Sequence, residues 1–540
     1  MSLTKATLAL EKGKKLAFSA PVAFSAPAEY EEKALKALRL FIPEIGFETA
    51  GSAVIRCSED QATGAEAYRL CISDGGVDIA FSDHAGLKNA LAFISLAATV
   101  KAGSLILPEC RIEDSPAAAY RGVMLDLGRG VADFEELKEH AVMISRAGFN
   151  VLHLHLCDSE GVGFEAESLP ESMRHRGAYT KAQLRELVEL ADVLGLRVLP
   201  EFDMPAHAGA LLKARPDLAC RVEGRDPATL SKWTVCPAKE EVYRVFDGVM
   251  EEIAGIFPDE YFHMGGDELD FADAPQIDQL CHWSECADCR ALMEKEGLKD
   301  RQDLYYHFTR RIRELCRKRG KKLMMWSDQI DCARPAGIPD DVLMQFWRVA
   351  GKGRGPVEGC SLNAQLKMGY TAVNSYYPNT YVDIENYINP EKLASWHWRS
   401  VPEVEKGLAS QIIGSELCAW EYGNRRDYPH YSRTVPAAVF LFGDKLFEGG
   451  TPDYTPAYRR TLTRAILSRS VPEDLDVFEA IGDVLPPRKK DQTFYPEKLS
   501  VSRERLEYIK SELEKLEGYT ARAYLESAID AEKYLEENHD

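Results

Sequence analysis

The sequence predicts an α/β protein whose main part is a (β/α)8 TIM barrel, with an N-terminal α+β accessory domain and a C-terminal helical extension. From residue 120 a strand, a loop and a helix recur in that order to about residue 450. Before this repeat, short alternating runs predict a small sheet, and after residue 499 the apolar spacing is helical. We therefore place the accessory domain at 1–114, the barrel at 115–455 and the extension at 456–540.

The accessory domain is predicted from a hairpin followed by a helix. Residues 67–72 and 76–81 alternate between apolar and polar side chains, with Ser73-Asp74-Gly75-Gly76 between them, a pattern typical of two antiparallel strands. A helix is expected from 85 to about 100. No residue in this part suggests chemistry, so we expect a scaffold role.

The barrel is predicted from eight short runs with the composition of buried strands, several of them separated by helical periodicity. The expected strands are 122–127, 150–155, 197–200, 261–264, 322–326, 342–346, 371–374 and 411–418. The clearest helices between them are 135–146, 181–194, 240–256 and 302–319. Active sites of such barrels lie at the carboxyl ends of the strands.

Composition limits the classes of partner. The chain has 540 residues, 45% of them hydrophobic, and a formal charge of -20, which disfavours nucleic acid and anionic membranes. The apolar run 91–100 is too short to span a bilayer. Ser and Pro interrupt a weak signal-like stretch at 12–21, and the thirteen cysteines are scattered, as in proteins with reduced thiols. We expect a cytoplasmic protein without nucleic-acid or membrane partners.

The stretch Tyr261-Phe262-His263-Met264-Gly265-Gly266-Asp267-Glu268 is the strongest candidate for the site. A strand stops at two glycines, which let the backbone bend and a ligand approach closely. Side chains alternate along an extended chain, so Asp267 and Glu268 point in different directions. One carboxylate can then orient a polar group of a ligand while the other exchanges a proton.

Acids, histidines and tryptophans also follow other predicted strands. The set comprises Asp126, His153, His155, Asp158, Glu201, Asp203, His207, Trp326, Trp347, Trp420 and Glu421. Aromatic walls around converging carboxylates suit a sugar, because a pyranose has apolar faces to stack and hydroxyls to bind. Any single tryptophan is as readily a core residue, so the set carries the inference.

These motifs resemble glycoside hydrolase family 20, the β-N-acetylhexosaminidases. The resemblance runs through YRGVMLD at 120–126, NVLHLH at 150–155 with Asp158, VLPEFDMPAH at 198–207, HMGGDE at 263–268 and GSELCAW at 414–420. It implies an exo-acting, retaining enzyme that removes terminal β-linked N-acetylglucosamine or N-acetylgalactosamine from oligosaccharides or glycoconjugates. In this substrate-assisted mechanism the 2-acetamido oxygen attacks the anomeric carbon, and no cofactor is required.

The resemblance also implies roles for the catalytic residues. Glu268 would be the general acid and then the base that activates water. Asp267 would orient the acetamido N–H and stabilise the positive charge of the intermediate. Asp158 and His207 would form a supporting relay that tunes the acid.

For substrate binding the resemblance implies a second set of residues. Arg121 and Asp383 would bind sugar hydroxyls, and Tyr381 would donate to the acetamido carbonyl oxygen. The walls of the pocket would be Trp326, Trp347 and Trp420. Glu421 would bind a further sugar hydroxyl. Two departures stand out. The loop at 159–164 differs from the family pattern, and Glu421 directly follows Trp420 where the family has one residue between them, so its side chain could face the opposite way.

Two other functions compete with this interpretation. His153 and His155 share a strand face and, with His207 and Asp267, could hold the metal of a metal-dependent barrel hydrolase. Packing inside the barrel is the simpler explanation for His153 and His155. A catalytically inactive carbohydrate-binding barrel is the other alternative.

Two features lie outside the predicted site. Cys281, Cys286 and Cys289 could bind a structural zinc, with His282 or Cys332 as the fourth ligand, or could be reduced thiols on a loop. The helical stretch at 499–537 could pack on the barrel or form a homodimer.

Overall fold

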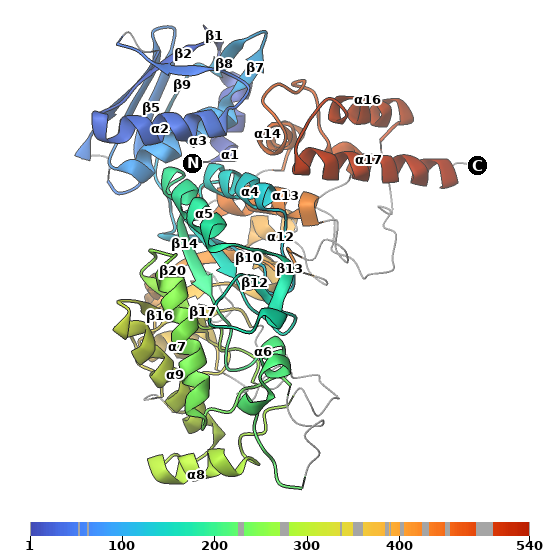
Figure 1. Ribbon diagram of the computed structural model, residues 1–540. Helices are drawn as coiled ribbons and strands as arrows, with labels where there is room; N and C mark the ends of the chain where they lie inside the picture. The colour runs from blue at the N-terminus through green and yellow to red at the C-terminus, as the bar shows by residue number, and fades with distance from the viewer. Residues whose placement is uncertain are drawn as a thin grey trace.

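The computed structural model has three parts that follow the chain order (Figure 1). The accessory domain lies at one end of the barrel, and the C-terminal helices lie beside both. The structure describes residues 2–51, 54–61, 64–224, 232–269, 280–334, 337–348, 360–383, 388, 390–399, 404–423, 431–448, 454–481 and 501–538.

The accessory domain is a layer of sheet against helices, as predicted. Its main sheet has the order β3-β2-β4-β6-β5-β9, and β1, β8 and β7 form a smaller sheet. The predicted hairpin is confirmed as the antiparallel pair β5 and β6. The strands are β1 (Lys15–Ser19), β2 (Val22–Ser25), β3 (Phe47–Thr49), β4 (Ile55–Glu59), β5 (Tyr68–Ser73), β6 (Gly76–Phe81), β7 (Thr99–Lys101), β8 (Ser104–Pro108) and β9 (Cys110–Asp114). The helices are α1 (Leu3–Lys12), α2 (Ala28–Phe41) and α3 (His84–Ala97).

The barrel is a closed ring of eight parallel strands, which confirms the predicted fold. The strand order is β10-β11-β14-β15-β16-β17-β18-β20, and β20 pairs with β10 to close the ring. These strands are β10 (Tyr120–Asp126), β11 (Val151–His155), β14 (Arg197–Glu201), β15 (Tyr261–His263), β16 (Lys322–Trp326), β17 (Leu343–Phe346), β18 (Ala372–Asn374) and β20 (Ile412–Ala419). All eight lie within two residues of the predicted positions.

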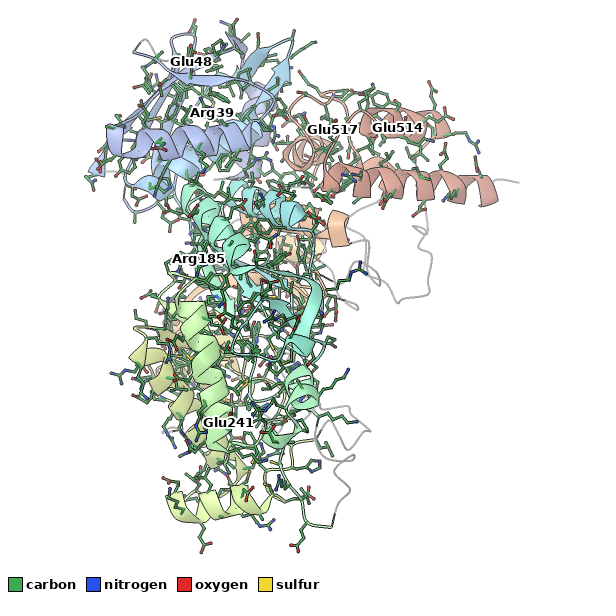
Figure 2. All side chains as sticks on the ribbon, viewed as in Figure 1. Arg39, Glu48, Arg185, Glu241, Glu514 and Glu517 are labelled. Atoms are coloured by element: carbon green, nitrogen blue, oxygen red, sulfur yellow. A yellow bond between two sulfur atoms is a disulfide. The ribbon has the colours of Figure 1, made fainter. Side chains whose placement is uncertain are left out.

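Helices pack around the ring. The main ones are α4 (Phe134–Arg146), α5 (Lys181–Val193), α7 (Glu240–Ala254), α9 (Arg301–Lys318), α10 (Leu362–Lys367) and α13 (Tyr431–Glu448). Their apolar faces turn inward: α5 buries Leu184 and Leu187 while Arg185, labelled in Figure 2, points to solvent. The side chain of Thr180 accepts from the backbone N–H of Gln183 and starts this helix as a capping box.

Smaller elements occupy the loops of the barrel. They are β12 (Val162–Phe164), β13 (Arg174–Tyr179), α6 (Gly209–Ala214), α8 (Ala287–Glu296), α11 (Tyr377–Thr380), β19 (Tyr381–Val382) and α12 (Pro390–Ser395), with short 3-10 turns at Glu171–Met173, Pro216–Leu218 and Lys406–Gln411. The strand β19 pairs with the end of β20.

The inside of the barrel is layered because side chains alternate along each strand. An apolar layer near the amino ends of the strands contains Tyr120, Val151, Leu199, Met324, Leu343 and Val373. A second cluster, at the opposite ends, contains Met124, Trp326, Tyr381 and Cys418. Carboxylates and histidines lie between them, and Glu416 bridges Tyr120 and His153. The apolar layer fills the barrel at the amino ends of the strands, which leaves the carboxyl ends for a site.

The C-terminal extension packs on its own chain. Its helices are α14 (Pro456–Ile466), α15 (Phe478–Ile481), α16 (Arg503–Leu513) and α17 (Tyr519–Asn538). The rings of Phe478 and Tyr524 meet at 6.2 Å, and Tyr458 donates to Asp444 of α13. The homodimer through these helices stays a prediction. Within the described ranges, no helix is long and apolar enough to cross a membrane.

Candidate active site

The turn after β15 carries the two predicted catalytic carboxylates. Gly265, Gly266 and Glu268 all have positive φ, at 69°, 96° and 41°. A Cβ on Gly265 would lie 1.7 Å from Oδ1 of Asp203, so this position admits only glycine. The strain at Glu268, which is not glycine, is of the kind found where a site over-determines its backbone.

Three side chains, two from other loops and one from α9, hold the backbone of this turn. The N–H of Glu268 donates to Oδ2 of Asp328 at 3.1 Å, and its carbonyl oxygen accepts from the indole of Trp233 at 2.7 Å. The hydroxyl of Tyr305 donates to the carbonyl of Gly266 at 2.7 Å. Both backbone polar groups of Glu268 are therefore fixed, which orients its carboxylate.

His207 faces both carboxylates, as the predicted relay requires. Its Nε2 lies 3.6 Å from Oδ2 of Asp267 and 3.5 Å from Oε2 of Glu268. Its Nδ1 lies 3.1 Å from Oδ1 of Asp158. The chain Asp158, His207, Glu268 therefore runs through one imidazole ring, which packs on Trp233 with ring centroids 4.4 Å apart.

The surrounding acids keep His207 positively charged. Burial alone would lower the pKa of His207, but the carboxylates of Asp158, Asp267 and Asp203 raise it well above its usual range. Burial also opposes the charge on Asp158, yet Arg129 and His207 hold the pKa of that carboxyl well below its usual range. An imidazolium can donate to the catalytic carboxylates, and Asp158 fixes its orientation.

The carboxyl group of Asp267 is strongly perturbed by its buried surroundings. Burial raises the pKa of Asp267 to about 7, with the charges of Asp328 and Glu268 adding to the effect and His207 opposing it. Its Oδ1 is buried and has no hydrogen-bond partner among the described residues. A donor or a positive charge on a bound ligand would fill that vacancy and favour the ionised form.

An aromatic cup lies beside the carboxylates, formed by the predicted wall residues Trp326, Trp347 and Trp420 together with Tyr381. Tyr381 stacks on Trp347 with ring centroids 6.3 Å apart and lies 5.9 Å from Trp420. The indole N–H of Trp326 donates to Glu201 at 2.8 Å, which fixes this ring as the floor. The cup combines apolar surface with rigid positioning, as a sugar or an acetamido methyl would need.

Arg129, on the loop after β10, is a site residue that the sequence analysis missed. Its guanidinium lies 5.1 Å above the Trp420 ring and pairs with Asp126 at 2.9 Å and Asp158 at 3.0 Å. It is 3.5 Å from Glu421, whose side chain therefore faces the site. Burial and the nearby acids Asp126 and Glu160 raise the pKa of Glu421 to about 8 although Arg129 opposes this.

The role predicted for Arg121 is wrong. Its side chain is fully buried and forms an ion pair with Glu66 of the accessory domain. It also donates to the carbonyls of Gly148 and Ala118 at 2.7 Å each. Tyr120 and Met124 face the inside of the barrel, so the alternation along β10 turns Arg121 outward. Arg121 joins the barrel to the accessory domain.

The remaining predicted residues divide between the rim and the interior. Asp383 lies half-buried one residue after β19. Burial raises the pKa of Tyr381 well above its usual range, and the charges of Cys418, Asp267 and Asp383 add to the effect. His153 and His155 are buried in the interior network: His153 contacts Glu416 at 2.9 Å, and His155 contacts Glu201 at 2.7 Å. Both histidines thus lie inside the barrel, hydrogen-bonded to buried carboxylates.

The cysteines are arranged differently from the prediction. Cys286 and Cys289 lie with Cys220 and Cys236, and these four form a buried group that we call the thiol cluster. Cys281 is not a member of it, so its prediction as a ligand is wrong. Neither predicted fourth ligand takes part: His282 contacts Glu285 at 3.0 Å, and Cys332 forms a disulfide with Cys360.

The site can perform proton transfer next to a stabilised positive charge. Glu268 and Asp267 meet at one charged histidine, and a rigid aromatic cup flanks them. Arg129, a charged donor, and the carboxyl group of Glu421 can bind hydroxyl groups.

Comparison with known proteins agrees with this description. The model of the glycosyl hydrolase family 20 catalytic domain matches residues 119–438. A β-hexosaminidase of Porphyromonas gingivalis is 28% identical over 434 residues, which span 73% of this chain and 53% of the relative. A β-hexosaminidase of Vibrio furnissii is 26% identical over 431 residues, 72% of this chain and 67% of the relative. The chain thus matches only about half the length of the first of these relatives.

A solved structure shows the same fold. The exo-β-N-acetylglucosaminidase of Vibrio harveyi in complex with N-acetylglucosamine superposes with a TM-score of 0.70 at 23% identity, covering 86% of this chain and 77% of that one. At this identity the likeness establishes the fold.

Proposed function

Because the chain belongs to glycosyl hydrolase family 20, we propose that this glycoside hydrolase is an exo-acting β-N-acetylhexosaminidase. It removes terminal non-reducing β-linked N-acetylglucosamine or N-acetylgalactosamine from oligosaccharides or glycoconjugates. The observation that carries the proposal is the meeting of Asp267 and Glu268 at Nε2 of His207, beside an aromatic cup. The names of the relatives support it.

In the first step the acetamido oxygen of the sugar attacks its own anomeric carbon while Glu268 protonates the departing oxygen. His207, positively charged, stabilises the carboxylate that Glu268 becomes. In the second step Glu268 takes a proton from a water molecule as that water attacks the anomeric carbon. The attack opens the oxazolinium-like intermediate, and the anomeric configuration is retained. No cofactor takes part in either step.

Asp267 acts on the acetamido group. Its unpartnered Oδ1 accepts the acetamido N–H, and its negative charge stabilises the positive charge that forms on the ring. Burial makes this interaction strong, because few waters compete and the effective dielectric is low. Tyr381 would donate its hydroxyl to the acetamido oxygen, and the tryptophans of the cup would enclose the methyl group.

The sugar hydroxyls would be bound at the rim. Arg129, Asp383 and Glu421 supply donors and acceptors there, and they are the residues that would set the choice between gluco and galacto sugars. We further propose a cytoplasmic location; the support is that eleven of the thirteen cysteines are outside disulfides, as reducing compartments favour.

Hydrolysis of nitrophenyl β-glycosides tests the function. The N-acetylglucosaminide, the N-acetylgalactosaminide and the plain glucoside are compared for wild type and Glu268→Gln, with and without a chelator. We expect cleavage of the acetamido sugars alone, unaffected by brief chelation and lost in the variant. Equal cleavage of the glucoside would contradict the acetamido mechanism.

Two further outcomes address the alternatives. Rapid loss of activity with chelator would favour the metal-dependent hydrolase. Absence of turnover, with retained binding of the free sugar, would favour a carbohydrate-binding protein.

A further inference from the structure

The thiol cluster lies apart from the catalytic carboxylates, and the proposed reaction does not use it. Cys220, Cys236, Cys286 and Cys289 are each at most 1% exposed. Their sulfur atoms lie within 4.8 Å of one another. The sulfur atoms of Cys220 and Cys289 lie 3.8 Å apart, those of Cys236 and Cys286 3.9 Å apart, and those of Cys236 and Cys289 3.5 Å apart.

These separations match the edges of a tetrahedron around one metal ion. Zinc binds thiolate sulfur at about 2.3 Å, so four tetrahedral ligands have sulfurs about 3.8 Å apart. A disulfide needs sulfurs about 2.05 Å apart, and the cluster contains none. Four sulfurs around one point, with only sulfur as ligand, select zinc among common divalent ions.

Two loops of the barrel supply the ligands in pairs. Cys286 is the N-cap residue of α8, and Cys289 lies in its first turn. Cys220 and Cys236 belong to the loop after β14, where the isolated bridge between Ala219 and Val235 places them side by side. Two chain segments that leave the barrel from neighbouring strands therefore meet at the cluster.

A positive charge lies close to the cluster. The ammonium group of Lys239 donates to the carbonyl of Ala219 at 2.6 Å, the residue before Cys220. Four thiolates on a divalent cation leave two negative charges, and a nearby ammonium offsets part of them.

We propose that the thiol cluster binds one structural zinc ion, with Cys220, Cys236, Cys286 and Cys289 as its four ligands. The site is closed, without room for water or substrate on the metal, so it holds the chain and does no chemistry. Cys281, eight residues before Cys289, is outside it.

The position of the site gives the zinc a task in the enzyme. Trp233, whose indole holds the carbonyl of Glu268, lies three residues before Cys236. Thr234, two residues before it, donates its hydroxyl to the carbonyl of Leu269 at 3.0 Å. Zinc thus fixes the loop that supports the turn of the catalytic acid.

Metal content of the purified full-length chain tests the proposal. Elemental analysis of protein prepared without added metal should find about one zinc per chain. Replacement by Co²⁺ should give the visible spectrum of a tetrahedral thiolate complex. Absence of bound metal would overturn the proposal. One iron per chain in place of zinc would overturn the assignment of the metal.

Matched variants separate the ligands from their neighbours. Cys289→Ser should reduce bound zinc at least tenfold, whereas Cys281→Ser, at the buried cysteine nearby, should retain it. Full zinc in Cys289→Ser would contradict the ligand set. Glu268→Gln should lose activity and keep its zinc, so failure of the zinc proposal and failure of the proposed reaction are distinguishable. The zinc content of the wild-type protein tests the proposal by itself, so the test does not depend on the folding of any variant.

Discussion

Nε2 of His207 lies 3.5 Å from Oε2 of Glu268, while the other ring nitrogen of His207 contacts Asp158 at 3.1 Å. The imidazole thus connects Asp158 to the carboxylate that we propose as the general acid. The carboxylates of Asp158, Asp267 and Asp203 raise the pKa of His207 well above its usual range against the effect of burial, which favours the charged ring. A charged ring stabilises the negative charges of the Asp267 and Glu268 carboxylates.

His207→Asn should lower kcat by about 10- to 100-fold, equivalent to losing a charged hydrogen bond of about 1.5–3 kcal/mol. Asparagine is the suitable replacement because His207 has φ of 52°, a region that asparagine tolerates. Since the charge of His207 lowers the pKa of Asp267, the variant should also move the acid limb of kcat/KM to higher pH. An unchanged limb would show that the ring carries no charge.

The ionisation of Asp267 should govern the acid side of the pH profile. A carboxyl with a pKa of about 7 is charged above that pH, and the proposed mechanism needs the charged form. The value of kcat/KM should therefore fall as pH drops through about 7. Binding of the acetamido N–H favours the carboxylate, so the limb of kcat should lie at lower pH than that of kcat/KM. A flat kcat/KM profile to pH 5 would contradict this assignment.

Replacement by methionine should reduce activity at Arg129 and stability at Arg121. Arg129→Met removes a group at the site and should reduce kcat/KM about 10- to 100-fold, the loss of one charged hydrogen bond. Arg121→Met leaves Glu66 and two carbonyls without their donor and should cost about 3 kcal/mol of unfolding free energy, as removing half of a buried pair does. Steady-state kinetics and thermal unfolding of both variants check the pair; reduced kcat/KM in a folded Arg121→Met would restore the original assignment.

The two arginines show which parts of the site can be predicted from the sequence. The strand ends, the turn at Asp267 and Glu268, and the aromatic set are local patterns, and the structure brings them together. The predicted role of Arg121 in sugar binding conflicts with the alternation along its strand. Tyr120 and Met124 face the inside of the barrel, so Arg121 faces outward. Arg129 had a weaker signal, three residues beyond Asp126.

Other residues had no local signal at all. Trp233 reaches Glu268 from a different loop, and Cys220 lies 69 residues before Cys289. Contacts between loops depend on how each loop folds back over the barrel, and the spacing within one segment does not specify that. The sequence therefore indicates Cys286 and Cys289 as ligands, but not their partners Cys220 and Cys236.

Gly265→Ala should abolish activity and destabilise the turn. The new Cβ would lie 1.7 Å from Oδ1 of Asp203, and the residue has φ of 69°. Gly297→Ala is the matched control, because Gly297, the C-cap of α8, has φ of 67° and nothing within 4 Å of an added Cβ. In the control the free energy of unfolding should fall by only about 1 kcal/mol, the cost of alanine in a left-handed backbone conformation, and kcat should be unchanged. Thermal unfolding and hydrolysis of the nitrophenyl N-acetylglucosaminide measure both effects. Equal behaviour of the two variants would show that backbone conformation, and not the contact with Asp203, makes glycine necessary beside the catalytic carboxylates.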